Sequence, residues 1–288
     1  KDLNELTRKA DLAMYCAKEA GKNRLVIFQP SMANGNLNKL TLQDEFADAL
    51  QCGELELYFQ PQLEVASNRL AGCEVLVRWH HRKHGLLLPA DFLAFAEESG
   101  AIRTMDYHVL REACRQSQKW RLDWGVEIPV AVNIANVHFR DLALLDEVRE
   151  ILRESQLPPA MLSLEFSETV LLDEVLVTQE LVAGLRRLGV KTTLDGFGAG
   201  LLAASHLHKI PLDSIKLDQS LYRSITRNPD ERRLASGLLA FTRELDIRLI
   251  AEGVEQDEQV RALRALGCPV IKGFVLYRPL PQGAFLQW

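Results

Sequence analysis

Residues 162–196 have the sequence LSLEFSETVLLDEVLVTQELVAGLRRLGVKTTLDG, and this stretch shows the unit from which most of the chain is built. Its two ends, LSLEF at 162–166 and VKTTLDG at 190–196, are short apolar and β-branched runs, which are typical of buried strands. Between them, residues 173–188 carry apolar side chains at helical spacing. The stretch therefore predicts a strand, a helix and a second strand, the repeating unit of a parallel sheet.

The alternation of strands and helices continues through the chain after residue 40. Further strands are predicted at 55–61, 72–79, 128–135, 214–218, 248–254 and 270–274. Further helices are predicted at 91–98, 103–121, 142–154, 230–245 and 255–266. Eight strands in an α/β chain of this length suit a (β/α)8 TIM-type barrel with a mainly parallel sheet. An open doubly wound sheet has similar signals and stays an alternative.

A polar or ionisable residue lies near the carboxyl end of nearly every predicted strand. These residues are Gln60, Glu74, Asn133, Glu165, Asp195, Lys216, Glu252 and Lys272. Because the carboxyl ends of barrel strands converge on one face, we expect these side chains to meet there. Strands that simply end in polar loops would explain any one of them. That explanation is weaker for carboxylates inside otherwise apolar strands, where an unpaired charge is costly.

Part of this set has the chemistry of a metal site. Glu74, Asn133, Glu165 and Asp195 offer three carboxylates and one amide oxygen. Such hard donors suit Mg²⁺ or Mn²⁺ far better than zinc or copper. A cation held there would polarise a phosphoryl oxygen and activate a bound water, which is metal-assisted hydrolysis. Lys216 would orient that water, Glu252 would act as its base, and Arg78 would clamp a phosphate.

The composition limits the partners of the chain. With 34 Lys and Arg against 39 Asp and Glu, the 288 residues have a formal charge of −5, which argues against a nucleic acid polymer as partner. The five cysteines contain no C-x-x-C pair, so we expect neither disulfides nor a zinc cluster, and a cytoplasmic location. No apolar run is long enough to span a membrane. Since the chain does not begin with Met, we expect it to be a fragment of a longer protein, and the part upstream of it could be tethered to a membrane.

Several motifs after residue 40 follow one another in a characteristic order. They are YFQPQ at 58–62, EVLVRW at 74–79, VNIA at 132–135, LEFSE at 164–168, LDGFGAG at 194–200, IKLD at 215–218 and AEGVE at 251–255. In this order they resemble the EAL domain, the cyclic di-GMP phosphodiesterase module of bacterial signalling, with Glu74-Val75-Leu76 standing where Glu-Ala-Leu is commonest. The resemblance implies a modified (β/α)8 barrel over nearly all of residues 41–288.

The front of the chain has a different resemblance. Residues 10–28, ADLAMYCAKEAGKNRLVIF, are similar to the last helix and strand of a GGDEF diguanylate cyclase domain. We therefore expect residues 1–29 to be the end of a GGDEF domain and residues 30–40, which contain Pro, Gly, Ser and three Asn, to be a linker. The catalytic half of that domain is absent, so no cyclase activity is expected of this fragment.

The EAL resemblance also implies roles for single residues. Glu74, Asn133, Glu165 and Asp195 would bind the first metal ion, and Lys216 and Glu252 would act on the catalytic water. Glu168 would stabilise the loop after Asp195. The residues implied on the ligand side are Gln60, Leu76, Arg78, Asp218 and Glu255. The resemblance further implies cyclic di-GMP as ligand, a possible homodimer, and an upstream GGDEF or sensor domain as partner.

Three departures from the family pattern bear on activity. The second of two adjacent aspartates, a ligand of the second metal ion, is replaced by Gly196. The Ser-rich loop beyond it has become LLAASHL at 201–207, and the late Gln-Gly-Tyr has become Lys272-Gly273-Phe274. We therefore expect one strong Mg²⁺ or Mn²⁺ site and a depleted second one.

These observations lead to competing hypotheses. The first is a degenerate EAL domain that serves as a cyclic di-GMP receptor with weak or no hydrolysis. The second is a working Mg²⁺- or Mn²⁺-dependent phosphodiesterase that produces linear pGpG. A scaffold that neither binds nor cleaves the nucleotide is a third.

Overall fold

The computed structural model describes residues 42, 45–50, 52–173, 175–198, 207 and 210–287. The chain divides into two compact units, one made of residues 1–55 and 79–102 and the other of residues 56–78 and 103–288. The expected GGDEF segment, 1–29, and the linker, 30–40, lie outside the described residues. The second unit contains the polar strand ends and is therefore the one that matters for function.

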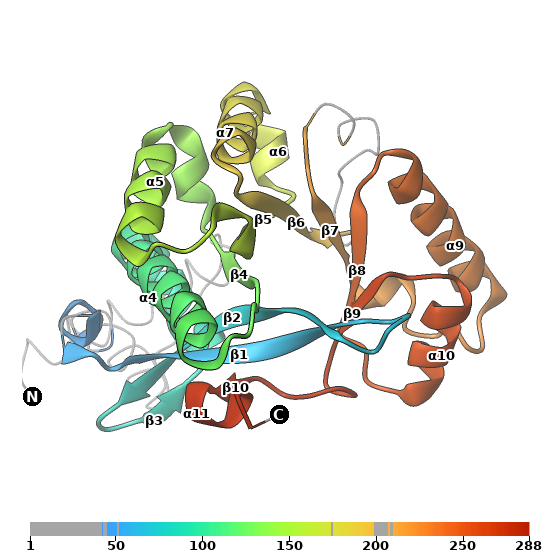
Figure 1. Cartoon of the computed structure of the whole chain (residues 1–288), viewed down its shortest axis with the longest axis horizontal. Helices are drawn as coiled ribbons and strands as arrows, with labels where there is room; N and C mark the ends of the chain where they lie inside the picture. Colours follow the sequence, from blue (N-terminus) through green and yellow to red (C-terminus); the bar gives the residue numbers. More distant parts are fainter. Residues whose placement is uncertain are drawn as a thin grey trace, which may run out of the picture. The chain divides into compact units, whose positions relative to one another are not determined.

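The larger unit is built on a closed barrel of eight strands (Figure 1). Around the barrel, each strand is hydrogen-bonded to the next, and a β1–β2 pairing closes the ring. In chain order the barrel strands are β1 (Leu55–Glu64), β2 (Leu70–His81), β4 (Val130–Asn133), β5 (Leu162–Ser167), β6 (Lys191–Phe197), β7 (Ser214–Leu217), β8 (Arg248–Glu252) and β9 (Val270–Lys272). The predicted barrel is confirmed, and the open doubly wound sheet is excluded because the β1–β2 pairing closes the eight strands into a ring.

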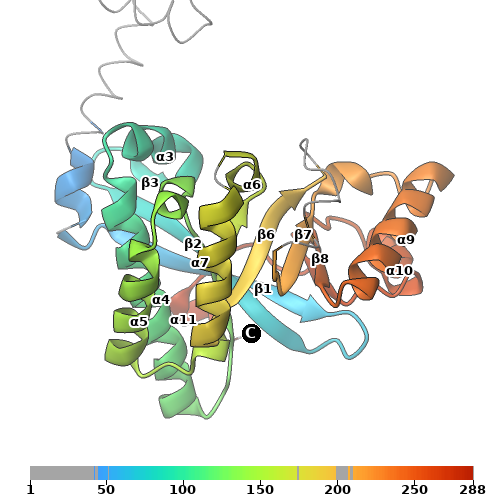
Figure 2. The same ribbon diagram turned by 90° about the horizontal axis from the view of Figure 1, so that it is seen from above.

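Amphipathic helices cover the outside of the barrel (Figures 1 and 2). They are α4 (Ile102–Trp124), α5 (Ala143–Ser155), α6 (Val170–Asp173), α7 (Val175–Leu188), α9 (Pro229–Glu244) and α10 (Asp257–Ala265). In α5, for example, Leu144, Val148, Ile151 and Leu152 are buried, as the i, i+4, i+7, i+8 spacing requires of one helix face. This apolar burial holds the strand ends in fixed relative positions.

One strand of the barrel, β1, is antiparallel to its neighbours. The sequence predicted a mainly parallel sheet but did not indicate which strand would be reversed. β1 is antiparallel to β9, while the pairs from β2 through β4 to β9 are parallel. A short turn joins β1 to β2, with Asn68 in the left-handed region at φ 57°. A connection this short allows only antiparallel neighbours. Gln60 therefore lies in the middle of β1 and not at a carboxyl strand end, which corrects that part of the pattern.

Besides the barrel strands and the helices that cover them, the described residues form two further pairs of elements. The two-residue strand β10 (Leu280–Pro281) pairs with β1 and leads into α11 (Gln282–Phe285). In the smaller unit, β3 (Gly85–Leu87) forms a hairpin with the end of β2, and α3 (Pro89–Glu98) follows. The sequence analysis did not predict β3, β10 or α11, because strands and helices this short carry too little periodicity.

The smaller unit has an aromatic core of its own. Phe46 packs against Trp79, Phe92 and Phe95, with ring centroids 5.3 to 5.7 Å apart. All four side chains are at most 1% exposed. The burial of these rings explains why Trp79, which follows a predicted site residue in the sequence, has a packing role.

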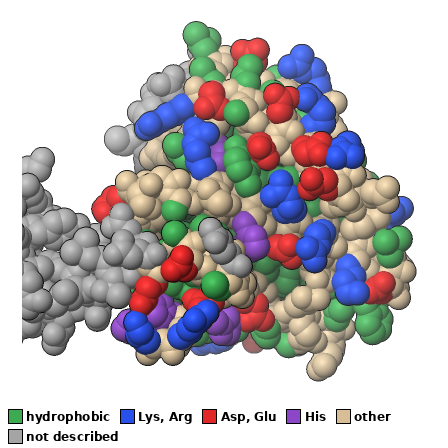
Figure 3. Space-filling view, turned by 90° about the vertical axis from the view of Figure 1, so that its left-hand side faces the viewer, with side chains coloured by type: hydrophobic (Ala, Val, Ile, Leu, Met, Phe, Trp, Pro, Cys, Tyr) green, Lys and Arg blue, Asp and Glu red, His purple; other side chains and the backbone are tan. Residues whose placement is uncertain are grey.

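The surface around α4 and α5 carries mixed charge. Figure 3 shows acidic and basic side chains interspersed on the face it presents. Several form exposed ion pairs, such as Lys119 with Asp123 at 2.6 Å and Arg111 with Glu154 at 3.0 Å. Among the described helices, none has the length and apolarity needed to cross a membrane.

Candidate functional site

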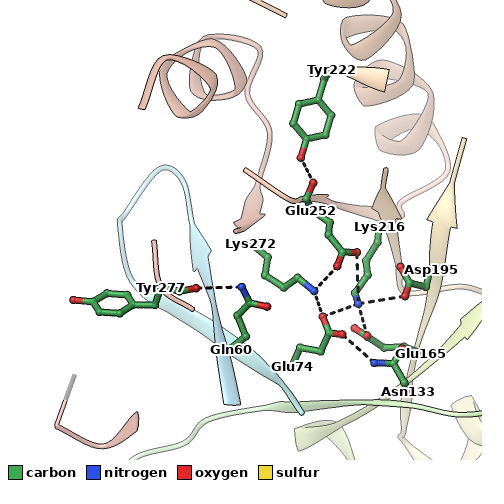
Figure 4. A network of polar contacts seen from close by, with 10 residues as sticks. All are labelled: Gln60, Glu74, Asn133, Glu165, Asp195, Lys216, Tyr222, Glu252, Lys272 and Tyr277. Carbon is green, nitrogen blue, oxygen red and sulfur yellow. Dashed lines mark hydrogen bonds and ion pairs between the residues drawn. The ribbon is translucent and has the colours of Figure 1, made fainter. Parts of the chain in front are cut away.

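Seven of the eight polar strand residues form one connected network at one end of the barrel. Figure 4 shows their side chains pointing toward one another from different strands. The connected residues are Glu74, Asn133, Glu165, Asp195, Lys216, Glu252 and Lys272. The predicted convergence of strand ends is therefore confirmed for this set. Gln60, the eighth residue, donates instead to the backbone oxygen of Tyr277 at 3.1 Å.

Glu74 is the centre of the network. It lies within β2 and is 3% exposed. Its Oε1 accepts a hydrogen bond from Asn133 Nδ2 at 2.9 Å. Its Oε2 accepts from Lys216 Nζ at 2.8 Å and also from Lys272 Nζ. A carboxylate buried this deeply needs such partners, because burying it unpaired would cost several kcal/mol.

Lys216 is surrounded by carboxylates from several strands. Its side chain comes from β7 and is fully buried. Besides Glu74, its Nζ forms an ion pair with Glu165 and lies 3.6 Å from Asp195 Oδ2 and 3.9 Å from Glu252 Oε2. Lys216 therefore links its own strand, β7, to four others through one ammonium group.

Lys272 supplies a second buried cation. It is the last residue of β9, and in the β8–β9 register it lies directly opposite Glu252. Its Nζ is 2.5 Å from Glu252 Oε1 and also contacts Glu74 Oε2. The residue is 4% exposed, so the ammonium group is enclosed by the cluster and not by solvent.

The lysines set the charge states in the cluster. Burial alone would raise the pKa of Glu74, but Lys216 and Lys272 together hold it well below its usual range. Burial raises the pKa of Glu165 to about 8, and Lys216 opposes that shift only in part. Burial would lower the pKa of Lys272, but Glu74 and Glu252 raise it above its usual value. Glu74 and Lys272 are therefore a charged pair at neutral pH.

Tyr222 is a site residue that the sequence analysis missed. It is fully buried, and its hydroxyl donates to the backbone oxygen of Glu252. This bond fixes the end of β8, where the Glu252 side chain departs toward Lys272. No motif marks Tyr222 in the sequence, and only its burial in the fold identifies it.

The comparison with protein families matches residues 43–279 to the EAL domain. The match covers most of the chain and includes every residue of the network. This chain belongs to the EAL domain family.

Related proteins have the same domain within longer chains. The bifunctional diguanylate cyclase/cyclic di-GMP phosphodiesterase MucR of Pseudomonas aeruginosa is 34% identical over 284 residues, which are 98% of this chain and 41% of MucR. The cyclic di-GMP phosphodiesterase PdeR of Escherichia coli is 32% identical over 287 residues, 100% of this chain and 43% of PdeR. The chain thus spans about two fifths of these relatives. The solved structure of the PaMucR phosphodiesterase in complex with c-di-GMP has a TM-score of 0.80 and 32% identity, covering 85% of this chain and 99% of that one.

The EAL domain presents Arg78 on the same strand as Glu74. Glu74, Leu76 and Arg78 alternate along β2 and therefore share one face of the strand. Arg78 is 9% exposed, its Nη1 donates to the backbone oxygen of Val77 at 2.8 Å, and its guanidinium lies over the ring of Tyr58 at 5.4 Å. These contacts hold Arg78 in place.

The other residues that were predicted on the ligand side lie outside the network. Asp218 caps a short 3₁₀ helix, where its side chain accepts from the backbone of Ser220 at 2.8 Å. Glu255 is exposed after β8. The carboxylate of Glu168 accepts a hydrogen bond from the backbone of Gly198, close to the loop it is expected to stabilise. Most of that loop, at 199–206, lies outside the described residues. The ligand roles of these residues stay predictions.

Gly196 sits in an irregular part of β6. The register with β7 shifts between Leu194 and Phe197, and Gly196 has φ +71°. A Cβ atom at this position would meet no heavy atom within 4 Å. The Cβ atom of an aspartate would therefore have room, at the cost of a left-handed conformation, which Asp tolerates better than most residues.

The residues of this EAL domain fit a divalent ion in chemistry but not in arrangement. Their oxygens are those that Mg²⁺ or Mn²⁺ prefers. However, the ammonium groups of Lys216 and Lys272 lie among these oxygens, and both bind the same oxygen of Glu74. Within the described part of the chain, no three acidic, His or Cys side chains form a group that could hold a metal ion. The cluster is thus organised around two lysines.

Proposed function

We propose that this EAL domain is a cyclic di-GMP receptor that hydrolyses the nucleotide weakly or not at all. The observation that carries the proposal is Gly196, which follows Asp195 and provides no carboxylate. Two-metal hydrolysis needs ligands for both ions, and the loss of an anionic ligand sharply lowers affinity for the second ion. Without that ion the attacking hydroxide is poorly generated.

The ligand-binding side of the domain supports nucleotide binding. Arg78 is buried, held by Tyr58 and Val77, and shares a strand face with Leu76. Arginine suits a phosphate because its planar N–H groups donate to two oxygens at once. The related PaMucR phosphodiesterase was solved as a complex with c-di-GMP, which supports this ligand class for the present chain. Gln60, Asp218 and Glu255 are the further contacts that we propose.

An active phosphodiesterase is the second candidate. It is favoured by the retention of six residues of the predicted hydrolytic site, namely Glu74, Asn133, Glu165, Asp195, Lys216 and Glu252. The names of MucR and PdeR, both phosphodiesterases, point the same way. In that case Mg²⁺ or Mn²⁺ would be required, and the product would be linear pGpG.

One paired assay separates the candidates. Binding of cyclic di-GMP is measured by calorimetry in EDTA and in Ca²⁺, and product formation is followed by chromatography with Mn²⁺ present. A receptor binds in calorimetry and forms almost no product. Turnover on the order of 1 per second, ordinary for enzymes, would establish the phosphodiesterase instead. Absence of binding under every condition would leave the scaffold hypothesis.

The domain boundaries and the assembly are proposals as well. We propose that residues 1–29 are the end of a GGDEF domain, that 30–40 are a linker and that 41–288 form the EAL domain. A homodimer and the action of an upstream GGDEF or sensor domain are further proposals. Light scattering of the protein with and without cyclic di-GMP tests the dimer, and a monomer in both conditions would contradict it.

A further inference from the structure

The position of Lys272 in the carboxylate cluster is the unexpected feature of this site. Its Nζ contacts Glu74 and lies 2.5 Å from Glu252, so it bridges carboxylates from β2 and β8. A metal ion in a carboxylate cluster would make the same kind of bridge. Lys216 already neutralises the other side of the cluster, through Glu165 and Asp195.

We propose that the ammonium group of Lys272 is a tethered cation that replaces a divalent metal ion, so that this domain binds cyclic di-GMP without one. The proposal rests on the proposed receptor function and concerns how the receptor site is kept in shape.

The charges of the cluster support this role. Four carboxylates, Glu74, Glu165, Asp195 and Glu252, surround the two lysines. Without a cation, the negative charges of ionised carboxylates in this cluster would repel one another and an incoming phosphate alike. Lys272 reduces that repulsion permanently. A divalent ion approaching the same Glu74 oxygen would meet a positive charge already in contact with it.

The backbone that carries Lys272 is fixed beside the residues that follow β8. The backbone oxygen of Lys272 accepts a hydrogen bond from Val254 N at 3.0 Å. The next residue, Gly273, packs so tightly that a Cβ atom would lie 2.0 Å from the oxygen of Val254. Any side chain at 273 would push the β9 end away from β8. Withdrawal of the ammonium group alone would leave buried Glu74 short of one partner.

The test compares two neutral variants and one charged variant with the wild-type domain. Lys272→Gln and Lys272→Met remove the charge at similar length, and Lys272→Arg keeps it. Lys119→Gln is the matched control, because Lys119 is an exposed lysine whose partner, Asp123, lies outside the cluster. For each protein, Mn²⁺ binding is measured directly by electron paramagnetic resonance, and cyclic di-GMP affinity is measured in EDTA and in Mn²⁺.

No Mn²⁺ binding at the cluster is expected for the wild-type domain, Lys272→Arg or Lys119→Gln. Each of these proteins is expected to bind the nucleotide with the same affinity in EDTA as in Mn²⁺. The neutral variants are expected to gain a Mn²⁺ site. Their nucleotide affinity in EDTA is expected to fall by about tenfold, with recovery in Mn²⁺, because a cation is then missing from the cluster.

Three results would overturn the proposal. One is stoichiometric Mn²⁺ binding by the wild-type domain, which decides the matter even if the neutral variants do not fold. Another is neutral variants that fold by circular dichroism and still respond to Mn²⁺ and EDTA like the wild type. The third is nucleotide binding by the wild-type domain only in the presence of a divalent ion. That result would leave the proposed receptor function intact and would contradict the proposal that Lys272 replaces the metal ion. Rapid hydrolysis, in contrast, removes the receptor function itself.

Discussion

Lys272 and Glu252 are joined through both backbone and side chain. They are opposite residues in the parallel register of β8 and β9, and Lys272 Nζ lies 2.5 Å from Glu252 Oε1. A cross-strand pair of opposite charge stabilises a sheet, and here it is buried and extends to Glu74 on β2. The ion pair therefore links the strands that a metal ion would otherwise have to link.

The stability of the domain is predicted to depend on Glu74. In Glu74→Gln, two buried ammonium groups lose the carboxylate that both contact. Breaking a buried ion pair in this way costs about 3–5 kcal/mol, so urea unfolding should occur at a clearly lower midpoint. In the control Asp123→Asn, an exposed pair is lost and the change should stay below about 0.5 kcal/mol.

A double variant tests the cause of that loss. Glu74→Gln alone leaves two buried ammonium groups without the carboxylate that both contact. Adding Lys272→Met removes one of these two charges. The double variant should therefore be more stable than the sum of the two single effects, by about 1 kcal/mol or more. Strict additivity would show that Glu74 and Lys272 do not act as a pair.

Restoring hydrolysis is predicted to need two changes. Gly196→Asp has room for its Cβ atom and returns the missing carboxylate, but Lys272 still lies between Glu74 and Glu252. The single variant should gain little Mn²⁺-dependent hydrolysis. Gly196→Asp with Lys272→Gln should exceed either single variant by about tenfold or more, because a metal then has both its ligands and an open position.

Initial rates of pGpG formation, followed by chromatography, check this prediction. Gly196→Ala with Lys272→Gln is the control, since it places a side chain at 196 without a carboxylate. Full activity from Gly196→Asp alone would show that Lys272 does not hinder metal binding. No gain in the double variant would place the defect in the loop at 201–207.

Nucleotide affinity is predicted to depend on Arg78. Arg78→Ala removes a charge-assisted contact worth about 1.5–3 kcal/mol, so the Kd for cyclic di-GMP should rise by roughly 10- to 150-fold. Arg78→Lys should keep only part of the affinity, because a lysine cannot make the two parallel hydrogen bonds. Arg115→Ala is the control, since Arg115 is exposed on α4 and pairs with Glu112. Calorimetry that shows equal affinity for Arg78→Ala and wild type would remove Arg78 from the ligand site.

The thiols are predicted to report on the fold. Burial raises the pKa of Cys114 to about 12 and that of Cys268 to about 11, whereas Cys52 is exposed. A maleimide should therefore modify Cys52 readily in the native protein. It should react with Cys114 and Cys268 only after unfolding in urea, because in the native protein these two thiols are buried and are not ionised to the reactive thiolate. Peptide mass mapping distinguishes the sites. Equal native rates for Cys52 and Cys114 would contradict the packing of α4 against the barrel.

The barrel could be predicted because its signal is local and repeated. Each strand from LSLEF at 162–166 to VIKGF at 270–274 carries its own apolar run, and each helix its own periodicity. The direction of β1 could not be predicted in this way, because a run of apolar residues has the same pattern in either direction. The two-residue strand β10 left no readable pattern either.

The sequence by itself determined the residue types of the site and their order along the chain. Glu74, Asn133, Glu165, Asp195, Lys216 and Glu252 could be selected because carboxylates and lysines are rare inside apolar strands. Only the tertiary structure decided the role of Lys272, and it also identified Tyr222. An ion pair between β2 and β9 joins residues 198 positions apart, and its geometry depends on barrel closure and strand register. The sequence showed that Lys272 departs from the family pattern, and the fold showed that its charge lies among the carboxylates.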